Sequence, residues 1–219
     1  MVYSNRLNNM KQLIFLVGIV ALAFQSQAQQ AINGVFEYKA SISLPDTNVV
    51  LKSWNVRVYT NDTIVRVETE TQLGIQVYIR HMELKKAYLL LDYDGNKYAI
   101  QTDLEESHKR DTMAPEYTVK RTSKKKIIAG IKCRKYIIRD KNQPEGYEGY
   151  FAKKIDHKYL EVYPEIAGLA VDYFLPSPDG LIHYELTQLN LTPVDRNLFG
   201  VPSDYKRVSF EEFVNMVSQ

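Results

Sequence analysis

Alternation of apolar and polar residues recurs along most of this chain and limits the folds that it can adopt. Between Phe36 and Leu44, every second residue is apolar, and the residues in between are charged or carry a hydroxyl group. Successive side chains of a β-strand point to opposite faces of the sheet, so such a segment buries one face and exposes the other. Segments of this kind recur as far as Leu191, which predicts a mainly β protein with antiparallel strands.

Turn residues divide the sequence into a series of short strands. Asn61-Asp62, Asp94-Gly95 and Ala129-Gly130 suit tight hairpin turns, because Gly, Asn and Asp tolerate the left-handed backbone conformation. The strands predicted from the alternation are 36–44, 54–59, 64–70, 73–79, 87–91, 98–100, 117–121, 124–128, 131–139, 147–151, 159–163, 170–175 and 181–191.

The end of the chain changes from strand to helix character. Ser209 and Glu212 fit a capping box, and apolar residues follow at helical spacing, so we expect one short amphipathic helix there. A polar stretch over residues 102–115 matches neither period. It is predicted to be a loop that either covers a site as a flap or forms a solvated connection.

An apolar segment near the start of the chain predicts export. Residues 13–24 are apolar, follow Lys11 and end before Ser26-Gln27-Ala28, which is the pattern of a secretory signal peptide over residues 1–28. The apolar run is too short for a bilayer, which needs about 20 residues, so no membrane-spanning segment is expected. The remaining residues 29–219 are predicted to form a single β-rich domain in the periplasm or outside the cell.

Charge and cysteine content exclude several classes of protein. The chain has 28 basic and 26 acidic residues, a balance that gives no reason to expect a nucleic-acid partner. Cys133 is the only cysteine, so packing rather than an internal disulfide must provide the stability. We expect Cys133 to be a small buried hydrophobe, with a reactive or intermolecular thiol as the alternative.

The sequence lacks recognisable patterns of catalytic or metal-binding residues. The four histidines are not spaced as ligands with one another or with Cys133, so neither a metal site nor a cofactor is predicted. Nucleophile elbows, phosphate-binding loops and metalloprotease motifs do not occur. We therefore expect a protein that is not an enzyme, and a pocket that holds converged ionisable residues, for example His183 with Glu185 or Asp172, would revive an enzyme as an alternative.

The densest charge feature is basic and lies in the hairpin predicted over residues 124–139. The candidates there for contact with a partner or with anionic head groups are Lys124, Lys125, Lys126, Lys132 and Arg134. The alternative is a solvated hairpin whose charges prevent edge-to-edge pairing with other chains.

Three segments resemble a known family, and they are residues 128–136 (IAGIKCRKY), 160–166 (LEVYPEI) and 198–206 (LFGVPSDYK). The family comprises exported Bacteroidota proteins with the domain of unknown function 4412. The chain is also similar to the related family named for its Gly-Leu-Pro-Gly-Leu-Ile motif, of which residues 177–182 keep a degenerate form. Where the family usually has Trp-Tyr, this chain has Val162-Tyr163.

The resemblance implies a LolA-like fold, that of the LolA and LolB envelope carriers. In that fold one strongly curved antiparallel sheet forms a half-barrel around short helices and encloses an apolar cavity for acyl chains. It implies a non-catalytic periplasmic binding or carrier protein for a lipid, a lipoprotein acyl chain or another amphipathic ligand of the cell envelope. A second function stays open, which is a structural or interaction protein that docks an envelope protein partner through its sheet or its basic hairpin.

Apolar residues of the predicted strands are the candidates for lining such a cavity on the inner face of the sheet. These residues are Phe36, Tyr38, Trp54, Val56, Val58, Ile75, Val77, Leu89 and Leu91. The same residues would serve equally well in a closed core, since alternating apolar residues fill interiors more often than they line ligand sites.

Overall fold

The computed structural model describes residues 32–43, 49–71, 74–104, 117–141, 144–160 and 162–218, which contain one sheet of twelve strands. The fold is therefore mainly β, as the alternation predicts. The predicted signal peptide lies outside the described residues. Among the described residues, no helix is long and apolar enough to cross a membrane.

Short turns and longer connections separate the elements of the sheet. The strands are β1 (Asn33–Ser43), β2 (Val50–Asn61), β3 (Ile64–Thr71), β4 (Gly74–His81), β5 (Lys86–Tyr93), β6 (Asn96–Asp103), β7 (Thr118–Ile128), β8 (Ile131–Arg139), β9 (Tyr147–Ala152), β10 (Leu169–Ser177), β11 (Gly180–Asn190) and β12 (Lys206–Ser209). The helices in the described part of the chain are the 3₁₀ helices η2 (His157–Tyr159) and η3 (Arg196–Phe199) and the α-helix α3 (Phe210–Val217).

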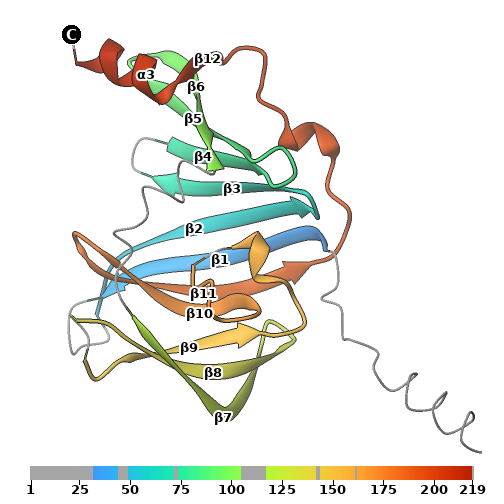
Figure 1. Cartoon of the computed structure of the whole chain (residues 1–219), viewed down its shortest axis with the longest axis vertical. Helices are drawn as coiled ribbons and strands as arrows, with labels where there is room; N and C mark the ends of the chain where they lie inside the picture. The colour runs from blue at the N-terminus through green and yellow to red at the C-terminus, as the bar shows by residue number, and fades with distance from the viewer. Residues whose placement is uncertain are drawn as a thin grey trace, which may run out of the picture. The chain divides into compact units, whose positions relative to one another are not determined.

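Two antiparallel meanders lie side by side in the sheet. The strand order is β12-β6-β5-β4-β3-β2-β1-β11-β10-β9-β8-β7 (Figure 1). Strands β1 to β6 pair with their neighbours in sequence, and so do β7 to β11, while the antiparallel pairing of β1 with β11 joins the two meanders. The short strand β12 adds to β6 as the one parallel neighbour in this order.

The predicted hairpin turns have the backbone conformation that their residues favour. Asp62 begins the turn between β2 and β3 with φ of 78°, and Asp94-Gly95 joins β5 to β6 with φ of 53° and 71°. These angles lie in the left-handed region, where Gly, Asn and Asp are the residues most easily accommodated. The turn residues thus explain why the strands before and after them pair as hairpins.

The larger core lies on one face of the sheet, which we call the inner face and which carries Phe36, Tyr38 and Val58. Phe36 pairs with Val58 on β2, and cross-strand partners share a face of the sheet. The connection between β9 and β10, residues 153–168, packs against this face and contributes Tyr159, Tyr163 and other residues to the larger core.

A smaller core lies on the opposite face, over β4, β5 and β6. It comprises Val77, Ile79, Leu90 and Ala99, and the segment that follows η3 packs on it. The sheet therefore buries apolar residues on different faces toward its two ends.

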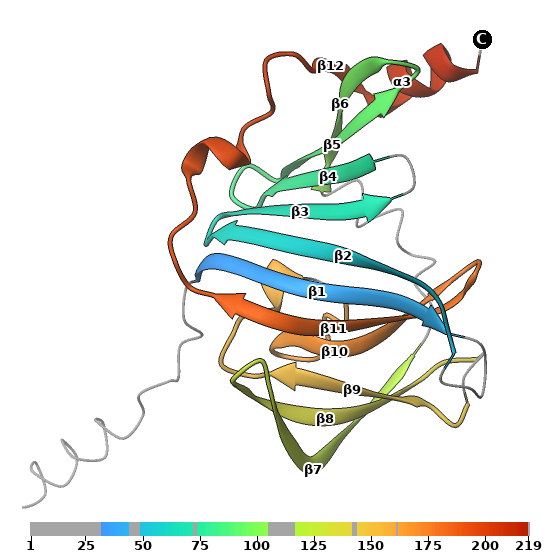
Figure 2. The same ribbon diagram turned by 180° about the vertical axis from the view of Figure 1, so that it is seen from behind.

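The C-terminal helix forms where the capping box predicts it. The Ser209 hydroxyl accepts a hydrogen bond from the Glu212 amide, and the Glu212 carboxylate accepts one from the Ser209 amide. Helix α3 lies beside β12 and β6 (Figure 2), and the ring of Phe213 contacts those of Tyr93 and Tyr98.

Two expectations about local structure need correction. The predicted strand over residues 159–163 is wrong, because Asp156 caps the 3₁₀ helix η2 there by accepting a hydrogen bond from the Lys158 amide. The Leu160 amide donates to the His157 carbonyl and the Val162 amide donates to the Leu160 carbonyl, so these backbone groups bond locally rather than to a neighbouring strand. Strand β12 was not expected, and the predicted polar loop begins inside β6, with residues 105–116 outside the described part of the chain.

Candidate functional site

The basic hairpin predicted from the sequence forms β7 and β8, and β7 is the terminal strand of the sheet. Ala129 and Gly130 make the turn with φ of 46° and 77°. Positive φ at both central positions is what a type I′ hairpin turn requires, and its twist matches that of the two strands. The hairpin therefore projects a two-residue tip at one end of the sheet's outermost pair of strands.

Near its tip, one face of the hairpin belongs to the larger core. Lys126 pairs with Cys133 and Ile128 pairs with Ile131, so these residues share a face. Ile128 and Cys133 are buried in the larger core, which confirms the expectation that Cys133 is a small buried hydrophobe. Burial raises the pKa of the Cys133 thiol to about 11, so the thiol stays protonated and unreactive at neutral pH.

Near the tip, the other face of the hairpin carries three cations around one isoleucine. Of these cations, Arg134 is half-buried opposite Phe151 of the larger core and donates to the Thr122 carbonyl at 3.3 Å. Lys125 lies directly opposite Arg134, and Ile127 lies directly opposite Lys132. Ile127 is 72% exposed, the highest value among the exposed large apolar side chains of the described residues. We call these four residues, Lys125, Ile127, Lys132 and Arg134, the tip patch.

The remaining cations of the hairpin have different surroundings. The Lys126 ammonium lies 3.9 Å from the Asp172 carboxylate and 5.3 Å from the centroid of the Tyr150 ring. Lys135 is buried and forms an ion pair with Glu148. Lys124 is exposed beside an irregularity of β7, where its amide donates to the Thr122 hydroxyl at 3.2 Å. The structure therefore groups only Lys125, Lys132 and Arg134 of the five predicted contact residues on one face.

Four of the nine predicted cavity residues lie in the larger core. Phe36, Tyr38, Val56 and Val58 are all buried on the inner face. The rings of Phe36 and Tyr159 lie 6.0 Å apart between their centroids, so the connection between β9 and β10 packs directly on these strands. At this place the apolar side chains contact protein, as the closed-core interpretation predicts.

Three further candidates share the inner face but are only partly buried. Trp54 lies opposite Ala40 of β1, and Leu89 lies opposite Tyr78 of β4. Leu91 follows two residues after Leu89 and so points to the same face. The exposure of Trp54, Leu89 and Leu91 is intermediate.

The expectation of a single inner face fails for Ile75 and Val77. Val77 pairs with Glu68 of β3, which in turn pairs with Arg57 of β2, so this row of residues lies on the opposite face. Ile75 is 61% exposed, whereas Val77 belongs to the smaller core. The alternation within this strand was predicted correctly, but alternation alone does not say which of two faces meets which core.

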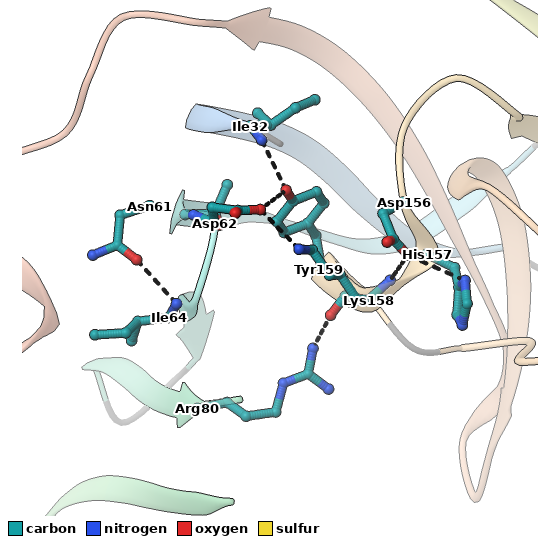
Figure 3. Close-up of polar contacts among 10 residues, drawn as sticks. Ile32, Asn61, Asp62, Ile64, Arg80, Asp156, His157, Lys158 and Tyr159 are labelled. Carbon is teal, nitrogen blue, oxygen red and sulfur yellow. Dashed lines mark hydrogen bonds and ion pairs between the residues drawn. The ribbon is translucent and has the colours of Figure 1, made fainter. Parts of the chain in front are cut away.

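A polar network that sequence reasoning missed holds the connection between β9 and β10 against the sheet (Figure 3). The Asp62 carboxylate accepts hydrogen bonds from the Lys158 ammonium and the Tyr159 hydroxyl, each at 2.7 Å. The Tyr159 hydroxyl also accepts a hydrogen bond from the Ile32 amide at 2.8 Å, and Arg80 donates to the Lys158 carbonyl. The network thereby joins four parts of the chain, of which the turn at Asp62 and the connection that carries Lys158 and Tyr159 meet at the carboxylate.

The electrostatics of this network follow from its partners. The hydrogen bonds from Lys158 and Tyr159 lower the pKa of Asp62, because they stabilise the carboxylate. Desolvation raises the pKa of Tyr159, which keeps its hydroxyl protonated as the donor to Asp62. The only sequence signal was Asn61-Asp62 as a turn, which predicts the backbone conformation of Asp62 but not its distant partners.

One pair of ionisable residues named in the sequence analysis does come together. His183 Nε2 lies 2.8 Å from Asp172 Oδ1, and the His183 ring stacks on Phe174 at 4.4 Å between centroids. Glu185 lies opposite Asp172 on the neighbouring strand. Among the described residues, no group of three or more His, Cys, Asp or Glu side chains could hold a metal ion.

Comparison with known proteins shows similarity of fold only. No family model matches it, and no curated protein gives a significant match. It is similar to a solved structure of PNGF-II at 13% identity and a TM-score of 0.51, covering 85% of this chain and 33% of that one, so it spans about a third of the length of PNGF-II. It is also similar to an uncharacterized conserved protein from Thermus thermophilus at 12% identity and a TM-score of 0.50, covering 87% of this chain and 99% of that one. At such identities the likeness establishes a shared fold and nothing about activity.

Proposed function

We propose that the protein is a non-catalytic binding protein of the cell envelope that docks an anionic partner through the basic hairpin β7–β8. The observation that carries this proposal is the pair Lys125 and Arg134, two cations held directly opposite each other. Like charges in this position destabilise a sheet by about 0.5 kcal/mol. An anionic group placed against the pair removes that repulsion, so the hairpin is better suited to a bound anion than to water alone.

The distribution of charge along the chain supports an anionic partner. Residues 118–139 hold nine basic residues and no acidic one, which leaves 19 of the 28 basic residues against all 26 acidic residues elsewhere. The hairpin is thus a basic element on a chain that is otherwise acidic. Such separation orients a protein in the field of a charged partner and accelerates encounter at low salt.

A test of docking compares two double variants that change the net charge equally. The chain is immobilised and challenged with an extract of its own envelope, and the retained partner is measured as the salt concentration rises. Lys125→Glu with Lys132→Glu should reduce retention at least about tenfold, because juxtaposed like charges are strongly unfavourable at an interface. The control, Lys86→Glu with Arg196→Glu, changes exposed residues outside the hairpin. Equal retention of both variants would count against docking through the hairpin.

A second candidate function is the carriage of a lipid, a lipoprotein acyl chain or another amphipathic ligand. The specific support is the partly buried set Trp54, Leu89 and Leu91 on the inner face, of which Trp54 packs against the larger core while Leu89 and Leu91 belong to neither core. Aromatic and aliphatic side chains in this state are suited to acyl chains. Native mass spectrometry of the same purified chain, followed by organic extraction, distinguishes the two functions, since carriage requires a stoichiometric acylated molecule.

The finer description of the fold belongs to the same proposal. We infer a LolA-like half-barrel within the exported family with domain of unknown function 4412, delivered by a signal peptide over residues 1–28. The support for curvature is the Tyr38 hydroxyl on β1, which donates to the Ala170 carbonyl on β10 at 2.8 Å although β11 lies between these strands. Neighbouring strands are about 4.8 Å apart, so a side chain that reaches across two strand spacings favours a sheet that bends toward its inner face.

A further inference from the structure

We propose that the anionic partner of the hairpin is the head-group layer of a lipid bilayer, with Ile127 inserted and the cations of the tip patch on the phosphates. The proposal rests on the docking function above and names its partner. It concerns the surface of a membrane, so it requires no membrane-spanning segment. The geometry that points to it is one strongly exposed aliphatic side chain next to the turn, surrounded by Lys125, Lys132 and Arg134.

The position of Ile127 matters because its neighbours leave it no apolar partner on its own face. Its cross-strand partner is Lys132, and the next residue on the same face of β7 is Lys125. Ile128, one residue later, is buried in the larger core, so the hairpin places its two adjacent isoleucines in different environments. Lys and Arg side chains have apolar stems that lie along a hydrocarbon surface while their charges reach the head groups.

The size of the patch favours a bilayer over a protein. A stable protein interface buries about 1,200 Å² or more in total, which requires some 20 residues from each partner. Four residues next to a turn cannot provide such an area. A bilayer needs only a few anchoring residues, because each lysine near an anionic surface strengthens binding about fivefold and an aliphatic side chain adds to this.

The charge of the rest of the chain sets the orientation. With an excess of acidic residues outside residues 118–139, other surfaces are repelled by anionic lipids while the hairpin is attracted. The protein should therefore approach with the tip of β7–β8 foremost. Salt should weaken this attraction, since the Debye length is about 10 Å at 0.1 M ionic strength.

Flotation with vesicles tests the proposal on the full chain as the cell produces it. The vesicles contain phosphatidylcholine with or without phosphatidylglycerol. We expect flotation only with phosphatidylglycerol and its loss at high salt. Ile127→Ser should weaken binding about tenfold, because the apolar contribution disappears. Lys125→Gln should weaken it about fivefold, because one phosphate contact disappears.

Matched controls distinguish insertion of Ile127 from nonspecific binding through exposed apolar side chains. Leu84→Ser removes an aliphatic side chain of similar size that is 66% exposed in the turn between β4 and β5, and it should float like the wild type. If Ile127→Ser also floats like the wild type, tip insertion is overturned. If the chain binds neither kind of vesicle but retains an acidic envelope protein through the hairpin, the lipid proposal fails and the docking function stands. Failure of both kinds of binding overturns both.

Discussion

Ala129 occupies the first position of the turn between β7 and β8 with φ of 46°, where an L-residue with a Cβ atom is unfavourable. The adjacent Gly130, with φ of 77°, carries no such penalty. A type I′ turn strongly favours Asn-Gly or Asp-Gly at these two positions. The hairpin is thus closed by a suboptimal residue at its tip.

Replacing Ala129 with Asn should stabilise the protein. Asn reaches the left-handed conformation more easily than Ala, so we expect the free energy of unfolding to rise by about 0.5–1 kcal/mol. Each kcal/mol raises Tm by about 2–4 °C in a protein of this size. Thermal unfolding followed by circular dichroism measures the change. Ala129→Val is the matched opposite, because a branched side chain at positive φ should lower Tm. A lower Tm for Ala129→Asn would mean that the Ala129 methyl makes a contact that outweighs the turn preference.

At the scale of elements, Asp62 ties the turn between β2 and β3 to η2. Its partners Lys158 and Tyr159 come from the connection that covers the inner face. The Asp62 side chain is 33% exposed, so solvent screens part of the interaction. One carboxylate nevertheless holds two elements that are distant in the sequence.

Asp62→Asn should destabilise the protein by about 1 kcal/mol at neutral pH. Asn still tolerates the left-handed turn, so the change isolates the charge. Because folding lowers the pKa of Asp62, its stabilisation is complete above the ordinary Asp pKa of about 3.9 and is lost as the pH falls through the lowered value. Urea unfolding at pH 7 and at a series of pH values below about 3.9 should therefore show a difference between the two proteins that shrinks as the pH falls.

The ion pair between Lys97 and Asp204 provides the control for this experiment. Its atoms are also 2.7 Å apart, but the two side chains are 45% and 56% exposed. Asp204→Asn should therefore change the stability far less than Asp62→Asn at neutral pH. Equal effects of the two substitutions would show that the turn link is no stronger than a surface ion pair.

At the scale of the whole molecule, the two cores on opposite faces should respond differently to the loss of a side chain. Leu186 lies in the larger core opposite Tyr38, where the two meanders join, and Leu90 lies in the smaller core. Leu→Ala at buried sites costs about 2–5 kcal/mol. Native-state hydrogen exchange should show that Leu186→Ala accelerates exchange throughout the sheet, whereas Leu90→Ala does so mainly in β4 to β6. Identical exchange patterns would mean that the sheet unfolds as one unit.

Much of the local structure was predictable because alternation and turn residues act over short distances. The hairpin turns at Asp62, at Asp94-Gly95 and at Ala129-Gly130 formed as predicted, and so did the capped helix that begins after Ser209. The cations of the hairpin are also visible in the sequence. Which of Lys125, Lys126, Lys132 and Arg134 share a face follows from the two-residue turn, whereas the irregularity of β7 between Arg121 and Lys125, which changes the register of the cations before it, was not predictable.

Contacts between distant segments were the part that the sequence did not reveal. The opposite placement of Ile75 and Val77 depends on which strands surround β4 and on what covers each face. The buried Tyr159 hydroxyl finds Asp62 across 97 residues. Apolar periodicity does not predict such polar pairs, because it indicates which residues are buried and not which residues they contact.

The pairing of β1 with β11 has a consequence for how the chain reaches this state. Each meander consists of strands adjacent in sequence, which close their loops quickly, but Val35 and Asn190 meet only after 155 residues have been connected. Because β11 comes late in the chain, β1 can pair with β2 early but remains an edge strand until β11 has been synthesised and has folded against it. During that interval the partly folded protein exposes the edge of β1 with Phe36, Tyr38 and Ala40. This edge is where aggregation or binding of a chaperone is most favoured.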